Sequence, residues 1–134
     1  MPAHGSQIVA DFWGCRLPAD ESAWRQVLLA AIDAMGVTLL HLHIHLFEPR
    51  GATAIALLAE SHLAIHTWPE GDYLAIDIFT CGTALRPEAG IDSLRQSLAP
   101  TREEVRHISR GDHRVHRPVA TIDPHTHDRE RPCP

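Results

Sequence analysis

The sequence has little of what several large classes of protein require. Its three cysteines, Cys15, Cys81 and Cys133, are far apart and form neither a disulfide framework nor a Cys-x-x-Cys zinc pair. No apolar run approaches the length of a membrane span, and residues 1–7 lack the charged and apolar regions of a signal peptide. A formal net charge of −5 argues against nucleic-acid and anionic-membrane partners. These absences favour a location in a reducing cytoplasm.

The length and the apolar content indicate a single domain. A chain of 134 residues with 44% hydrophobic residues can bury one modest core, which we expect within residues 1–110. A chain this short often completes its core or its site by oligomerising. From Gly111 onward, prolines mix with His, Arg and Asp without an apolar period, so we expect residues 111–134 to form a disordered polar tail.

Apolar periodicity predicts the order of the elements. Spacings of three and four predict one helix capped by Asp20 and ending at Gly36, and a second helix that starts at Pro87. Alternating or β-branched runs predict strands on both sides of the segment 60–70, at residues 6–14, 37–47, 53–59, 73–79 and 103–109. The coarse order is β-α-β-β-β-β-α-β, with the segment 60–70 counted among the four middle strands, and it predicts an α+β fold, a two-layer sandwich with helices on one face of an antiparallel sheet. Nothing in the chain covers the other face, so we expect two sheets to pack face to face in a homodimer.

Three histidines alternate with apolar residues in the strand predicted at 37–47. His41, His43 and His45 share one face with Phe47, and Leu40, Leu42, Ile44 and Leu46 share the other. Alternate imidazoles can chelate a metal ion, but no carboxylate or cysteine stands at a complementary spacing. We therefore expect no metal site and interpret the row as a polar interface between sheets.

The segment Glu60 to Glu70 has an unusual density of reactive side chains. It reads Glu-Ser-His-Leu-Ala-Ile-His-Thr-Trp-Pro-Glu, and Cys81 follows after one predicted hairpin. Ser61 has three possible uses: a hydrolase nucleophile, a structural hydroxyl, or a nucleophile that attacks the carbonyl of Glu60 and converts the peptide into an ester. The hydrolase reading lacks a Gly-x-Ser-x-Gly elbow.

The third use has a chemical sequel. A base near the Cα of Ser61, for which His66 is the candidate, can eliminate the Glu60 carboxylate and leave dehydroalanine, which becomes a pyruvoyl group. That carbonyl forms a Schiff base with a substrate amine and accepts the electrons released with CO₂, and a thiol such as Cys81 can return the proton. In an unbroken strand Ser61 and His66 would face opposite sides, so we expect a kink or bulge at Glu60–Ser61.

The run from Glu60 to Glu70, followed by Ala-Ile-Asp-Ile-Phe-Thr-Cys-Gly at 75–82, resembles the prokaryotic S-adenosylmethionine decarboxylase proenzymes. The similarity spans most of residues 5–110. It implies a self-cleaving zymogen, a carboxy-lyase (EC 4.1.1.50 class) of polyamine and spermidine biosynthesis, which decarboxylates S-adenosylmethionine with a pyruvoyl group made from Ser61. It also implies cleavage between Glu60 and Ser61 into a β chain of residues 1–60 and an α chain from 61 onward, and a dimer of αβ units.

The resemblance also implies roles for single residues. His66 matches the processing base and Cys81 the catalytic proton donor. Among the expected substrate-binding residues, Phe47 matches an aromatic that stacks on adenine and Glu70 matches a carboxylate on the ribose. Thr53 and Trp68 are also expected to bind the substrate, Trp68 because its neighbours Pro69 and Glu70 place it in a turn beside the site rather than in the core. Thr53 replaces a serine that assists processing and keeps its hydroxyl. Asp11 replaces a glutamate, and its own position suits either a solvated strand end or a site carboxylate.

Two other functions remain open from the sequence. A pyruvoyl group decarboxylates any amino acid that fits the site, so arginine or ornithine is an alternative substrate on the same machinery. A non-catalytic, His-rich metal-binding module is an alternative of another class.

Overall fold

Two helices and six strands make up the part of the chain that the computed structural model describes, residues 4–82 and 85–111. Their order is β-α-β-β-β-β-α-β, as predicted. The elements are β1 (Gly5–Trp13), α1 (Glu21–Met35), β2 (Leu39–Leu46), β3 (Ala52–Leu58), β4 (Ser61–Trp68), the 3₁₀ turn η1 (Pro69–Gly71), β5 (Tyr73–Thr80), α2 (Pro87–Leu98) and β6 (Arg102–Arg110). The tail expected at 111–134 lies almost wholly outside the described residues.

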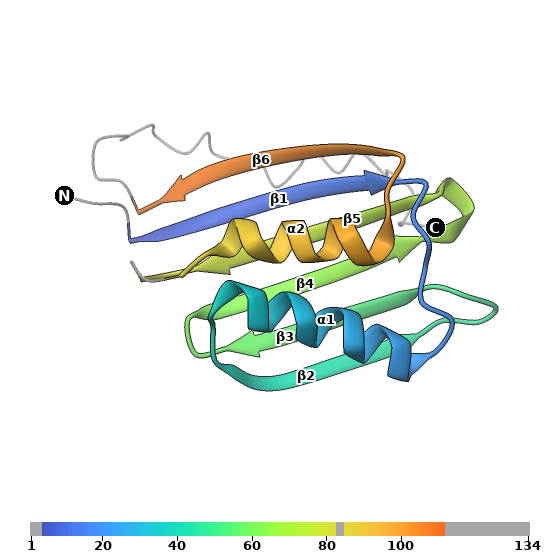
Figure 1. Cartoon of the computed structure of the whole chain (residues 1–134), viewed down its shortest axis with the longest axis horizontal. Helices are drawn as coiled ribbons and strands as arrows, with labels where there is room; N and C mark the ends of the chain where they lie inside the picture. Colours follow the sequence, from blue (N-terminus) through green and yellow to red (C-terminus); the bar gives the residue numbers. More distant parts are fainter. Residues whose placement is uncertain (1–3, 83–84, 112–134) are drawn as a thin grey trace, which may run out of the picture.

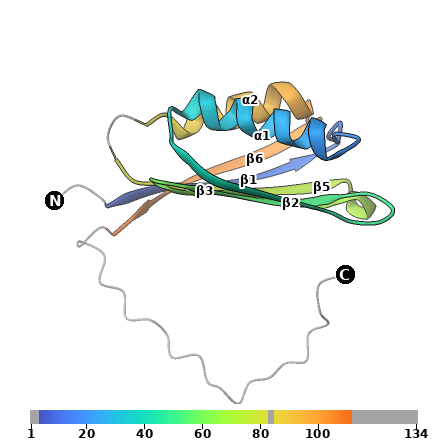
Figure 2. The same ribbon diagram turned by 90° about the horizontal axis from the view of Figure 1, so that it is seen from below.

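The described strands form one antiparallel sheet in the order β2-β3-β4-β5-β1-β6. Figure 1 shows α1 lying over β2 to β4 and α2 over β5 and β1, and Figure 2 shows both helices on the same side of the sheet. The predicted α+β fold with helices on one face is therefore confirmed. We call the opposite, uncovered side of the sheet the open face.

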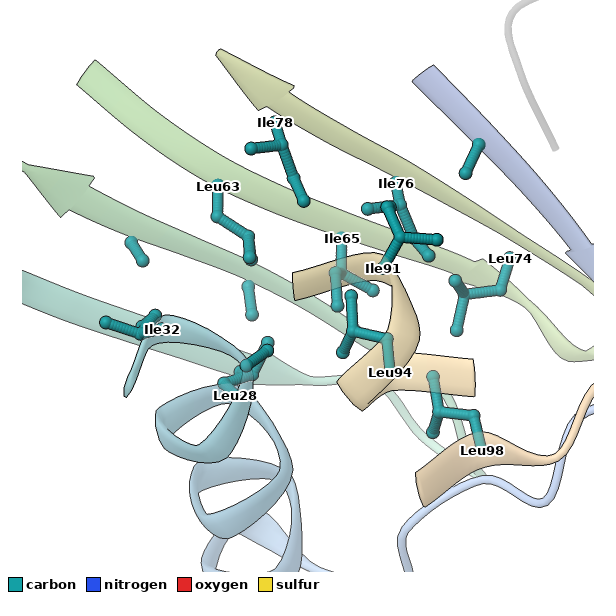
Figure 3. Close-up of a cluster of buried hydrophobic side chains, with 14 of the residues drawn as sticks. Leu28, Ile32, Leu63, Ile65, Leu74, Ile76, Ile78, Ile91, Leu94 and Leu98 are labelled. Carbon is teal, nitrogen blue, oxygen red and sulfur yellow. The ribbon is translucent and has the colours of Figure 1, made fainter. Parts of the chain in front are cut away.

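The core lies between the helices and the sheet. The apolar stripe of α1 predicted from its spacing is buried at Trp24, Leu28 and Met35, and α2 buries Ile91 and Leu94. Figure 3 shows Leu28 of α1 with Ile91 and Leu94 of α2 close to leucines and isoleucines of the sheet. The caps are also as expected, because the Asp20 carboxylate accepts a hydrogen bond from Ala23 N at 2.8 Å and Gly36 ends the helix with a φ of 70°. The helices thus fix one face of the sheet and leave the other free for chemistry.

Two details of the predicted strands were wrong. A register shift between Leu39 and His41 expels Leu40, which is 60% exposed and does not join the buried row with Leu42. The run at 53–59 is small and apolar, which is typical of a strand buried on both faces, but Ile55 and Leu57 are about half exposed on the open face. The open face therefore carries apolar side chains that nothing in the described chain covers.

Neither described helix is long and apolar enough to cross a membrane.

Candidate active site

The turn between β3 and β4 holds the predicted scissile bond. Leu58 pairs with Ser61 across the hairpin, so Ala59 and Glu60 form a two-residue loop. Ser61 has a φ of 145°, in a region that residues with a side chain rarely adopt. Strain of this kind costs on the order of 1–3 kcal/mol and persists only where the surroundings hold it. The kink that the sequence predicted at Glu60–Ser61 is therefore present.

The carbonyl oxygen of Glu60 accepts two hydrogen bonds from one residue. Cys81 donates its backbone N–H over 3.0 Å and its thiol over 3.3 Å. Attack by a hydroxyl on this carbonyl would place negative charge on the oxygen that these two donors reach. Cys81 is exposed at the end of β5, where Thr80 pairs with Ser61. The structure thus brings Glu60, Ser61 and Cys81 together, three of the predicted site residues.

An imidazole lies beside the hydroxyl of Ser61, but it belongs to His62. The Ser61 Oγ to His62 Nδ1 distance is 3.2 Å, and the ring of His62 packs edge-on against Phe79 with centroids 6.0 Å apart. Sequence reasoning gave His62 no role, although its place directly after the serine was a signal. Because an activated hydroxyl needs a base within hydrogen-bond reach, His62 can take the proton of Ser61.

His66 lies far from Ser61 within one chain. The two residues pair at opposite ends of β4, Ser61 with Thr80 and His66 with Ala75. Five residues of extended strand separate their Cα atoms by about 16 Å. Instead, the Nδ1 of His66 lies 3.1 Å from the hydroxyl of Thr53 on β3. One chain alone therefore does not bring His66 to the bond that it is expected to help cleave.

A second group of predicted residues surrounds this histidine. A groove of about 680 Å³ at the η1 end of the sheet is lined by the predicted substrate-binding residues Phe47, Thr53, Trp68 and Glu70, together with His66 and others including Arg50. The guanidinium of Arg50 reaches the carbonyl of Pro69 at 3.4 Å and so supports the turn that carries Glu70. Sequence reasoning did not single out Arg50. Aromatic walls with a carboxylate suit a ligand that has a flat ring, hydroxyls and a cationic centre.

A row of stacked side chains crosses the open face beside the groove. Trp68 stacks on Tyr73 with centroids 5.3 Å apart, Tyr73 packs on Trp13 at 5.5 Å, and the guanidinium of Arg102 lies 4.3 Å above Trp13. The hydroxyl of Tyr73 donates to Asp11, which also accepts from Arg106 at 3.0 Å. Burial, followed by the hydrogen bond to Asp11, raises the pKa of Tyr73 to about 12. The sequence left two interpretations of Asp11, a solvated strand end and a site carboxylate. In the structure its carboxylate binds Tyr73 and so supports the row of rings that ends at Trp68.

Within the described residues, no three His, Cys, Asp or Glu side chains come together in a metal-binding arrangement. The histidines of β2 are exposed on the open face, and the ring of His45 packs edge-on against Phe47 at 4.6 Å.

The α+β sheet carries, in one hairpin, a serine in a strained conformation and a neighbouring carbonyl oxygen that accepts two hydrogen bonds, an arrangement that suits attack of the hydroxyl on that carbonyl. Comparison with known proteins names the family. The sequence profile described as S-adenosylmethionine decarboxylase matches residues 6–111. The S-adenosylmethionine decarboxylase proenzyme of Methanococcus maripaludis is 42% identical over 113 residues, which cover 83% of this chain and 93% of that protein. The proenzyme of Thermomicrobium roseum is 42% identical over 112 residues, or 83% of this chain and 97% of that one.

A solved structure agrees with the sequence matches. The crystal structure of the adenosylmethionine decarboxylase from Aquifex aeolicus superposes with a TM-score of 0.73 at 31% identity, covering 84% of this chain and 94% of that chain. The chain belongs to the S-adenosylmethionine decarboxylase family. The resemblance found in the residues from Glu60 to Gly82 is therefore confirmed.

Proposed function

We propose that this chain is an S-adenosylmethionine decarboxylase proenzyme (EC 4.1.1.50) that cuts itself between Glu60 and Ser61 and then serves polyamine biosynthesis. Membership of the family supports the activity. The observation that carries the self-cleavage is the pair of hydrogen bonds from Cys81 to the carbonyl oxygen of Glu60, next to a strained Ser61.

Cleavage begins with ester formation. His62 takes the proton of the Ser61 hydroxyl, the oxygen attacks the Glu60 carbonyl, and Cys81 stabilises the negative oxygen that results. Collapse expels the amide nitrogen, which takes up a proton, so Glu60 becomes esterified to Ser61. Release of the strained φ at Ser61 favours this direction.

Elimination then breaks the ester. A base removes the proton from the Cα of Ser61, the Cβ–O bond breaks, and the Glu60 carboxylate leaves. The dehydroalanine tautomerises to an imine, which takes up one water and releases ammonia, so the new α chain begins with a pyruvoyl group. The residues fit this group, because Ser61 becomes its carbon skeleton at a turn where the thiol of Cys81 lies on the neighbouring strand end. The pyruvoyl group supplies an electrophilic carbonyl that binds the substrate amine and accepts electrons as CO₂ leaves.

Other residues bind the substrate and handle protons. Cys81 returns the proton after CO₂ leaves, since its thiol is exposed beside the cleavage site. Phe47 and Trp68 provide the aromatic walls of the groove for the adenine and the sulfonium, and Glu70 accepts hydrogen bonds from the ribose. Thr53 holds His66 through its hydroxyl.

A second copy of the chain completes the site. Ser61 and the groove around His66 lie at opposite ends of β4, so they meet only if another protomer brings its groove to the Ser61 end. We expect the two open faces to pack about a two-fold axis perpendicular to the strands. This axis places the Ser61 end of each protomer against the His66 groove of the other, so the dimer contains two equivalent sites. Ile55, Leu57 and Ile108 on the open face are between 43% and 51% exposed and would be buried by this packing.

The mass of the fragments tests the self-cleavage. We expect the purified protein to consist of residues 1–60 and an α chain that is lighter by about 17 Da, the mass of ammonia, than a fragment starting with serine. Ser61→Ala should remain one uncut chain. A fragment that starts with serine, or cutting of the Ser61→Ala variant, would show ordinary proteolysis.

The substrate is tested separately. Release of CO₂ from S-adenosylmethionine, arginine and ornithine is compared at equal concentrations of cleaved protein, and we expect turnover of S-adenosylmethionine alone. Preference for a basic amino acid would leave the self-cleavage intact and overturn the substrate. The cytoplasmic location stays a prediction.

A further inference from the structure

The side chain of Glu60 makes a contact that the self-cleavage chemistry does not use. Its carboxylate accepts the backbone N–H of Thr38, at 3.0 Å through Oε2 and 3.3 Å through Oε1. The carbonyl of Thr38 in turn accepts the N–H of Ala59 at 2.9 Å. Thr38 lies in the short link between α1 and β2, far from Glu60 in sequence. Both residues of the two-residue loop are thus tied to one distant residue.

The same loop is held on its other side by β5. The carbonyl oxygen of Glu60 accepts both donors of Cys81, so Glu60 is fixed by its side chain on one side and by its main chain on the other. The peptide bond that must break lies between these two anchors.

The backbone of the loop indicates what the anchors do. Two-residue hairpin loops normally place positive φ angles within the loop, as in type I′ and II′ turns. Here neither Ala59 nor Glu60 has a positive φ, and the positive φ falls on Ser61 instead. Ser61 carries a side chain, so this conformation costs free energy. The contacts of the loop with Thr38 and Cys81, which lie outside the hairpin, are placed to hold the strained form.

We propose that the Glu60 side chain is a positioning residue for self-cleavage. By holding the N–H of Thr38, it keeps Ser61 in its strained conformation and keeps the Glu60 carbonyl on the donors of Cys81. This role rests on the proposed self-cleavage and adds to it, because the carboxylate touches none of the reacting atoms. The contact needs an acceptor of the right length and does not need a particular chemical reactivity.

The rates of cleavage of newly made chains test this role. Wild type, Glu60→Ala, Glu60→Gln and Glu60→Asp are made by cell-free translation with a short labelling pulse, and the uncut fraction is followed with time. We expect Glu60→Ala to slow cleavage by about tenfold or more, since the anchor is lost. Glu60→Gln keeps an oxygen acceptor at the same distance, so its rate should stay within about threefold of wild type. Glu60→Asp is one methylene too short and should resemble Glu60→Ala.

A second measurement follows the anchor itself. In the uncuttable Ser61→Ala chain, hydrogen exchange of the Cys81 N–H reports whether the Glu60 carbonyl stays in place. We expect Glu60→Ala to speed this exchange and Glu60→Gln to leave it nearly unchanged, although neither change touches Cys81. Glu88→Ala is the matched control, because it removes an exposed carboxylate of α2 and should alter neither the cleavage rate nor the exchange.

Three outcomes would overturn the proposal. Cleavage of Glu60→Ala at the wild-type rate would show that the anchor does nothing for the reaction. Equal slowing in Glu60→Gln and Glu60→Ala would show that the acceptor oxygen is not what matters. No cleavage in the wild type would overturn the proposed function as well, so the failures of the two proposals are distinguishable.

Discussion

Cys81 is proposed to act in both steps, self-cleavage and decarboxylation. Its backbone N–H and its thiol both reach the Glu60 carbonyl before cleavage, and its thiol is the proposed acid afterwards. A substitution of its side chain therefore acts on two steps, which can be measured separately.

We predict that Cys81→Ala slows cleavage by up to about 10²-fold and does not abolish it, because one of two donors remains. Cys81→Ser keeps a side-chain donor and should cleave faster than Cys81→Ala. Decarboxylation by cleaved protein should fall steeply in both variants, since an alcohol is a much weaker acid than a thiol. Pulse-labelled cleavage rates and CO₂ release from the cleaved fraction check the two steps. Wild-type turnover in Cys81→Ala would remove the thiol from the acid role.

At the residue scale, the sequence predicted which residues take part in the chemistry more successfully than it predicted how their side chains are arranged. The odd spacing between Ser61 and His66 predicted a kink or bulge at Glu60–Ser61, and the φ of 145° at Ser61 agrees with a kink. The contact between Ser61 and His62 was missed, because regular alternation would place neighbouring side chains on opposite faces. The positive φ breaks this alternation, and no pattern in the sequence gives a dihedral angle.

At the scale of the elements, the apolar spacings predicted both helices and every strand to within a few residues. Register irregularities were not predicted, and the one before His41 exposes Leu40. The row formed by Trp68, Tyr73 and Trp13 was missed as well, since it joins the consecutive strands β4 and β5 to β1, which lies at the start of the chain. Pairing of β1 with β5 is decided by the whole sheet, and local patterns do not contain it.

The row gives a prediction that can be followed by absorbance, because Tyr73 is the single tyrosine. The phenolate signal of the folded Ser61→Ala chain should appear with a midpoint near pH 12, against the ordinary 10.0. Asp11→Ala should lower this pKa, while burial keeps it above 10.0. Because the folded pKa is raised, the stability that it contributes is complete below pH 10 and lost as the pH rises toward 12. A midpoint at the ordinary value in the folded chain would contradict the buried hydrogen bond.

The hydrogen bond between Tyr73 and Asp11 should also affect substrate binding in the groove that Trp68 lines. Tyr73→Phe keeps the ring and removes the hydroxyl that donates to Asp11, so we expect a loss of about 1 kcal/mol in the free energy of unfolding. Since Trp68 is then held less firmly, the KM for the substrate should rise more than kcat falls. Urea unfolding of the uncut chain and steady-state kinetics of the cleaved protein measure these two effects.

For the whole molecule, one absence in the composition bears on the chemistry. The 12 basic residues are all arginines, so the chain has no lysine side chain. An electrophilic carbonyl reacts with free amines, and a guanidinium that is always protonated does not compete for it. The pyruvoyl group proposed for this protein therefore meets no lysine of its own chain or of a second copy that could capture it.

In the proposed dimer, Ser61 of one protomer and His66 of the other act in the same site, and mixed dimers test this pairing. Ser61→Ala lacks the bond-forming oxygen but keeps His66, and His66→Ala keeps Ser61 but lacks the expected base. If each site joins Ser61 of one protomer to His66 of the other, a mixed dimer contains one complete site. Expressed by itself, the His66→Ala chain is expected to stop at the ester. We expect it to form the pyruvoyl fragment when Ser61→Ala is co-expressed with it.

A size tag on the His66→Ala chain identifies which protomer is cut, and random pairing at equal expression limits the yield to about half of the tagged chains. Hydroxylamine distinguishes stalled ester, which it splits, from completed fragment. The test is repeated with a tagged His66→Glu chain in place of the tagged His66→Ala chain, because it also lacks the imidazole. If the tagged chain remains an ester in the mixture although the two variants co-purify, His66 does not act across the interface. If it matures fully without any partner that carries His66, the base is another residue, and His62 beside the hydroxyl is then the candidate.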